Sequence, residues 1–109
     1  MTKTEEARVK FIERTNGPER LICEAEIHFA AGVLAGMKLV GFTLWRSAEG
    51  EVYVTLPARP FGAGGERRYF DILRSVEGQA ADVKRVKGWI LEAYRAHDAA
   101  IDALNTAIA

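Results

Sequence analysis

Apolar residues recur with two different periods along this chain, and the period changes once. Between Leu21 and Phe29 apolar side chains occupy every second position and the intervening positions are mostly polar. A period of two predicts a β-strand with one buried side and one side in water. From Val83 onward the apolar residues recur in steps of three and four, which predicts a helix. Strands followed by one long helix predict an α+β domain.

Turn residues divide the first part of the chain into about five short strands of a small antiparallel sheet. Asn16-Gly17-Pro18 is a turn signal, and Ser47 to Gly50 predicts a hairpin connection. The predicted strands cover residues 9–13, 21–29, 37–46, 51–56 and 67–73. The small residues of the connector Ala30 to Gly36 predict no particular conformation.

The third predicted strand is apolar on both faces. Strict alternation places Val40 on the same face as Phe42 and Leu44, and Leu39 on the face of Trp45. Gly41, inside this strand, indicates a possible β-bulge.

The helix is predicted from about Gln79 to Asn105, and it carries an apolar stripe with heptad character. The stripe consists of Val83, Lys87, Ile90, Tyr94, His97, Ile101, Leu104 and Ile108. At 1.5 Å per residue this helix is roughly 40 Å long, more than a small sheet needs for cover. Its outer half is therefore expected to pack on a second copy of the chain, or, alternatively, the last ten residues fray. The predicted interface of this homodimer comprises Ile90, Tyr94, His97, Ile101 and Leu104.

The size of the chain bounds the architecture. With 109 residues and 49% hydrophobic content it can bury one modest core. We expect a single domain, with a core from about residue 8 to 97 and a helical extension over residues 98–109. The polar N-terminus and the absence of a long apolar run predict a cytoplasmic protein without a membrane partner. The single cysteine, Cys23, falls on the apolar side of its strand and is expected to be a buried structural thiol.

Charge is balanced overall but unevenly distributed. The chain carries 15 basic and 15 acidic side chains, which argues against a uniformly basic chromatin-type protein. Residues 59–87 hold seven basic and four acidic side chains and form the only net-positive block. A single basic region of this kind can bind phosphates, with strong salt dependence.

The basic residues of this block fall into two groups. Arg59, Arg67 and Arg68 bracket a glycine- and proline-rich loop between two strands, and Lys84 and Arg85 lie in the first turns of the helix. Arginine pairs bidentately with phosphate, and a helix start favours anions through its free N–H groups. The alternative interpretation is that these charges only keep the protein soluble.

Catalytic and metal-binding patterns are weak. Glu24, Glu26 and His28 share one strand face, but neighbouring same-face side chains are nearly 7 Å apart, too far for all three to reach one ion unaided. No nucleophile has a base placed by a motif. Gly62-Ala63-Gly64-Gly65 lacks the Gly-Lys-Ser/Thr and the following helix of a phosphate loop. We therefore expect no enzyme, no metal, no cofactor and no small-molecule substrate.

The order of these elements resembles the SpoVG (stage V sporulation protein G) family, small bacterial regulators with a β-sheet and a C-terminal helix. The resemblance covers about residues 8–97. Its features are the strand ending at Trp45, the turn Ser47 to Gly50, Tyr53-Val54-Thr55-Leu56-Pro57, the basic loop Arg59 to Arg68, Phe70-Asp71-Ile72, and Ile90 to Tyr94 in the helix. The chain departs from the family in its glycine-rich loop, long connector and helical extension, so the resemblance is to a divergent member, of bacterial or phage origin.

The resemblance implies a homodimeric regulator that binds DNA or RNA. It assigns nucleic-acid contacts to Arg59, Arg67 and Arg68 and, by their position in the helix region, to Lys84 and Arg85. The alternative function is a protein-interaction module that docks a partner on the long helix and binds no nucleic acid.

Overall fold

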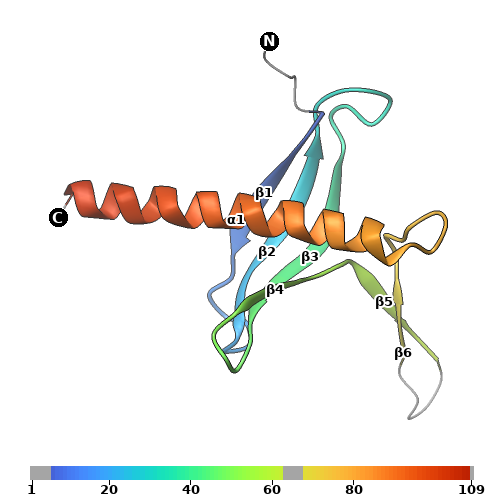
Figure 1. Ribbon diagram of the computed structural model, residues 1–109, viewed down its shortest axis with the longest axis horizontal. Coiled ribbons are helices and arrows are strands. Elements are labelled where there is room, and N and C mark those ends of the chain that lie inside the picture. The colour runs from blue at the N-terminus through green and yellow to red at the C-terminus, as the bar shows by residue number, and fades with distance from the viewer. Residues whose placement is uncertain (1–5, 63–67, 109) are drawn as a thin grey trace.

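The chain folds as a four-stranded antiparallel sheet with a separate two-stranded ribbon and one long helix (Figure 1). The structure is a computed structural model that describes residues 6–62 and 68–108. Its elements are β1 (Ala7–Glu13), β2 (Leu21–Phe29), β3 (Lys38–Arg46), β4 (Val52–Thr55), β5 (Ala58–Phe61), β6 (Arg68–Asp71) and α1 (Ala80–Ile108). The predicted α+β class is confirmed.

The predicted single sheet of about five strands is wrong in one respect. β1 to β4 form a sheet in the order of the sequence, whereas β6 pairs with β5, a segment that the sequence pattern placed in a loop. Pro57 follows β4 and has no N–H group with which to continue the ladder. The chain leaves the sheet there, and the Ile72 N–H returns to the Pro57 carbonyl at 2.8 Å. We call the β5–β6 ribbon the arm.

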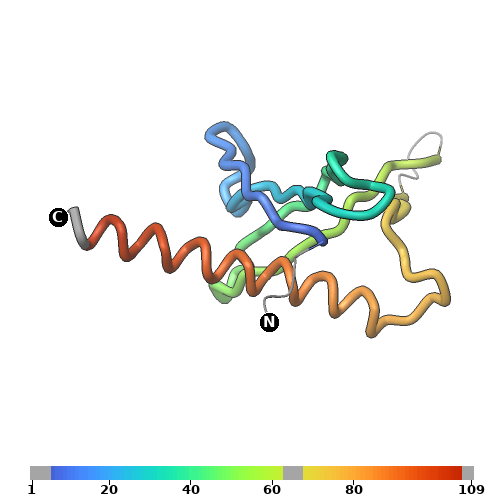
Figure 2. Tube along the Cα trace, turned by 90° about the horizontal axis from the view of Figure 1, so that it is seen from above, coloured from blue at the N-terminus to red at the C-terminus, as the bar shows by residue number. Residues whose placement is uncertain are grey.

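The core lies between one face of the sheet and α1, which forms a second layer (Figure 2). Alternate residues of β2 supply Cys23, Ala25 and Ile27, as the period of two predicts. The other buried members are Phe42, Leu44, Val54, Leu56 and Ile90. Ile90 is the residue of α1 that is completely buried (0% exposed), so it anchors the helix on the sheet.

Gly41 does mark a bulge, and the bulge changes which residues face the core. Ala25 pairs with Phe42 and Ile27 with Leu39, so two residues of β3 oppose one residue of β2. Gly41 has φ +106°, and a Cβ there would lie 3.0 Å from the Pro57 side chain. The extra residue turns Leu39 toward the core and leaves Val40 51% exposed, the reverse of strict alternation.

The connector between β2 and β3 is a closed turn. Gly36 donates its N–H to the Phe29 carbonyl at 2.9 Å, and Met37 donates to the Leu34 carbonyl at 2.9 Å. These backbone bonds hold an apolar tip in water, since Val33 is almost fully exposed.

Side-chain hydrogen bonds fix the start of α1, and its C-terminal end extends beyond the sheet. The Ser75 hydroxyl accepts the Gln79 N–H at 2.9 Å and donates to the Asp82 carboxylate at 2.6 Å, which satisfies a free donor at the helix start. The predicted range of about residues 79–105 is close to the observed Ala80–Ile108. Figure 1 shows the C-terminal end of α1 projecting past the sheet.

Candidate nucleic-acid interface

The arm carries its arginines and two aromatic rings on one face. Arg59 pairs with Phe70 across the ribbon, and Phe61 pairs with Arg68. Directly paired residues share a face, as do residues two apart on a strand, so these four side chains point to the same side. All four are exposed. The sequence pattern placed Arg59 in a loop and Arg68 at the start of the strand that follows it; the structure places both on paired strands.

A third arginine, missed by sequence reasoning, joins this face. The guanidinium of Arg74 lies 4.3 Å from the centre of the Phe70 ring, a cation–π contact. Phe70 in turn packs edge-to-face on Phe61, with ring centres 5.8 Å apart. The only sequence signal for a role of Arg74 was that a basic residue directly follows the predicted strand 67–73. We call Arg59, Phe61, Arg68, Phe70 and Arg74 the basic arm face.

Within the part of the chain that the structure describes, no ion pair balances the charge of the basic arm face. Among residues 6–62 and 68–108, none of its three arginines forms an ion pair with a carboxylate. Arg67, also predicted to bind nucleic acid, lies outside the described residues, and its role stays a prediction.

The start of α1 carries the other two basic residues that were predicted to contact nucleic acid, Lys84 and Arg85. Arg85 pairs with Asp82 at 2.8 Å, and this pair, together with the Ser75 hydroxyl, holds the pKa of Asp82 below its usual range, the hydroxyl having the larger effect. The Arg85 charge is therefore partly balanced, whereas Lys84 is exposed. Arg74 and Arg85 line one hollow of about 390 Å³ between the segment that precedes α1 and the first turns of the helix.

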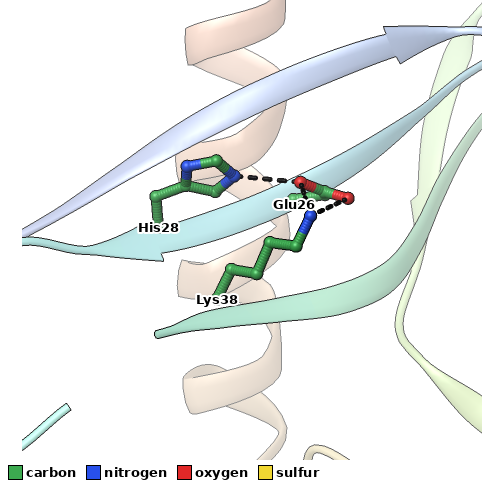
Figure 3. A network of polar contacts seen from close by, with 3 residues as sticks. All are labelled: Glu26, His28 and Lys38. Carbon is green, nitrogen blue, oxygen red and sulfur yellow. Dashed lines mark hydrogen bonds and ion pairs between the residues drawn. The ribbon is translucent and has the colours of Figure 1, made fainter. Parts of the chain in front are cut away.

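The possible metal ligands on β2 do not converge. Glu26 accepts a hydrogen bond from His28 Nε2 at 2.9 Å and pairs with Lys38 Nζ at 3.2 Å (Figure 3), and these partners lower its pKa. Glu24 turns to Arg14 instead. In the part of the chain that the structure describes, no three His, Cys, Asp or Glu side chains gather closely enough to hold a metal ion. The three residues of β2 form ordinary surface ion pairs, which contribute little to stability.

The predicted dimer residues divide into covered and exposed ones. The interface role predicted for Ile90 is wrong, because its burial in the core of one chain leaves no surface for a second. Tyr94 and His97 contact Phe11 of the same chain, with ring centres 5.6 and 5.1 Å apart, yet His97 remains exposed.

After these residues, the described apolar side chains of the stripe are exposed to solvent. Ile101 is 37% and Leu104 60% exposed, and Ile101 also lines a small cavity against β1 and β2. The exposed part of the stripe therefore begins at His97 and includes Ile101 and Leu104.

The predicted burial of the single cysteine is confirmed. Cys23 is buried in the core, and burial, reinforced by the negative charges of Glu13 and Glu24, raises its thiol pKa to about 11. A thiol with this pKa is almost entirely protonated near neutral pH and is a poor nucleophile.

The described ranges contain no helix both long and apolar enough to cross a membrane. We compared the chain with models of protein families, with curated proteins and with solved structures. None of these three comparisons finds a match.

Proposed function

We propose that this protein binds nucleic acid through the basic arm face. The observation that carries the proposal is the register of the arm, which aligns Arg59 and Arg68 with two phenylalanine rings on one side of a ribbon. The two arginines are diagonal neighbours, so their Cβ atoms are expected about 7–8 Å apart. Long side chains at this spacing can contact two separate phosphates of one strand.

The geometry of the arm suits backbone contacts better than sequence readout. Guanidinium groups on a projecting ribbon bind phosphates, which give affinity without selecting bases. The resemblance to the SpoVG family supports a regulatory role for this binding. DNA and RNA both present the phosphates that the proposal requires.

A salt titration tests this function directly. Fluorescence anisotropy with labelled oligonucleotides at 50 and 200 mM salt should show affinity falling about 20- to 40-fold if three phosphates are neutralised, because each contact releases counterions. Absence of binding at 50 mM salt, or binding of equal strength at both concentrations, would contradict the proposal and favour the protein-interaction alternative.

We also propose that the free end of α1 packs against a second copy of the chain. Ile101 and Leu104 are three residues apart on one side of the helix and expose apolar surface. Ile101 lies at the margin of the sheet, and Figure 1 shows the last turns of α1 projecting past it. Small residues next to them in the sequence, Ala100 and Ala103, allow another helix to approach closely.

Leu104→Lys should convert the protein from a dimer to a monomer. Light scattering at micromolar concentration should give about twice the chain mass of 12.0 kDa for the unaltered protein and the chain mass for the variant, because a charge in an apolar interface is costly. Thr106→Lys, about 200° around the same helix, is the matched control and should remain dimeric. A monomeric unaltered protein would contradict the proposed dimer and favour a different protein as the partner of this surface.

A further inference from the structure

A second surface lies on the opposite side of the arm from its arginines. Tyr69 and Asp71 of β6 point away from the basic arm face, because they alternate with Arg68 and Phe70. They line a groove of about 660 Å³ together with residues of β3, β4 and α1. The members used below are Thr43, Trp45, Tyr53, Thr55, Tyr69, Asp71 and Lys87.

The sheet side of this groove is the face turned away from the core. Leu44 and Val54 pair across β3 and β4 and are buried, so their neighbours Trp45 and Tyr53, which also pair, point to the other side. β4 is the edge strand of the sheet, and the groove continues round this edge to Lys87 of α1. Three strands therefore bring three aromatic rings to a single groove, and α1 adds one cation.

One ring of the groove is fixed by a hydrogen bond, and the other two are open to solvent. The Trp45 indole N–H donates to the Thr43 hydroxyl at 2.9 Å, and that hydroxyl also contacts the hydroxyl of Thr55. The one polar group of the indole is thus satisfied inside the protein, and the ring is held in place by its neighbours. Tyr53 is 48% exposed and Tyr69 70% exposed, so both rings are accessible to a ligand.

We infer that this groove stacks the bases of an unpaired nucleic-acid strand. Aromatic side chains beside cations are the common device for binding single strands without selecting their sequence. Bases in a duplex are already stacked on one another, so only unpaired bases can reach these rings. Asp71 places a carboxylate in the groove, which repels phosphate but accepts hydrogen bonds from base amino groups.

The two sides of the arm are suited to different parts of a nucleotide: one side to phosphates and the other to bases. Arg68 and Tyr69 are consecutive, so phosphate contacts on one side of β6 and base contacts on the other are one residue apart. Lys87 supplies a second cation at the far end of the groove. Aromatic rings beside Lys87, on the reverse side of a ribbon that carries arginines, favour nucleic acid over an apolar peptide, which would not require the cations.

This inference rests on the proposed function and adds a preference for single strands. A 20-mer of deoxythymidine and a 20-base-pair duplex, both labelled, are titrated at 50 mM salt. The unaltered protein should bind the single strand at least tenfold more tightly. Tyr53→Ala with Tyr69→Ala should weaken single-strand binding tenfold or more, as loss of stacking predicts, and change duplex binding less than twofold. Tyr53→Phe with Tyr69→Phe keeps the rings and should bind as the unaltered protein does.

A fluorescence measurement tests the groove without disturbing it. In a Trp89→Phe background, Trp45 is the remaining tryptophan, and saturation with the deoxythymidine 20-mer should quench its emission. Binding of both probes with no quenching and no selective loss in the alanine variant would overturn the groove inference and leave the proposed function intact. Binding of neither probe would overturn both. An alanine variant that fails to fold leaves the quenching result to decide.

Discussion

Replacing Ile90 with alanine is expected to lower the free energy of unfolding by about 2–5 kcal/mol. Ile90 is completely buried (0% exposed) in the cluster that joins α1 to the sheet. Truncation removes apolar contacts and leaves a cavity that the surrounding strands fill only in part. Domains are typically stable by only about 5–15 kcal/mol, so a loss of this size removes much of the total. Urea denaturation followed by circular dichroism measures it.

Ile72→Ala provides the matched control for this prediction. The side chain is the same, but Ile72 is 56% exposed, and its truncation should cost less than about 1 kcal/mol. The loss at Ile90 should also be independent of protein concentration, since the residue packs within one chain. A change below 1 kcal/mol at Ile90, or one that depends on concentration, would show that α1 is not anchored as described.

Arg59→Ala combined with Arg68→Ala is expected to weaken nucleic-acid binding by about 100-fold. A charge-assisted hydrogen bond is worth about 1.5–3 kcal/mol, which is at least tenfold in affinity for each arginine. The sites are independent enough for the losses to add approximately. Because phosphates rather than bases are contacted, the loss should be similar for different probe sequences. Anisotropy titrations over a range of salt should show the slope of log affinity against log salt reduced by about two.

A control with the same change in net charge separates this site from general electrostatic attraction. Arg20→Ala with Arg95→Ala removes two exposed arginines that lie outside the arm and should change affinity by no more than about twofold. Equal losses in the two double variants, or an unchanged affinity in a folded Arg59 and Arg68 variant, would contradict the basic arm face as the binding surface.

The sequence by itself determined the elements whose signals are local. Alternation along β2 identified the buried side of Cys23, and the turn residues before Gly50 identified the β3–β4 hairpin, because each depends on neighbouring side chains only. The heptad spacing likewise predicted α1 to within a few residues of its observed bounds. The arginines at both ends of the glycine-rich segment marked the region of the candidate site.

Only the tertiary structure decided how these elements meet. The extra residue at Gly41 reverses the facing of Leu39 and Val40, and its position depends on contact with Pro57, sixteen residues away. Pairing of β5 with β6 depends on a register across the arm, and it places Arg59 and Arg68 on one side and Tyr69 on the other.

The same holds for the helix. Ile90 and Leu104 belong to one apolar stripe, and no local pattern distinguishes them. Docking of α1 on a sheet shorter than the helix buries the first completely and leaves the second 60% exposed, because burial depends on what lies opposite a residue and not on its own sequence neighbourhood.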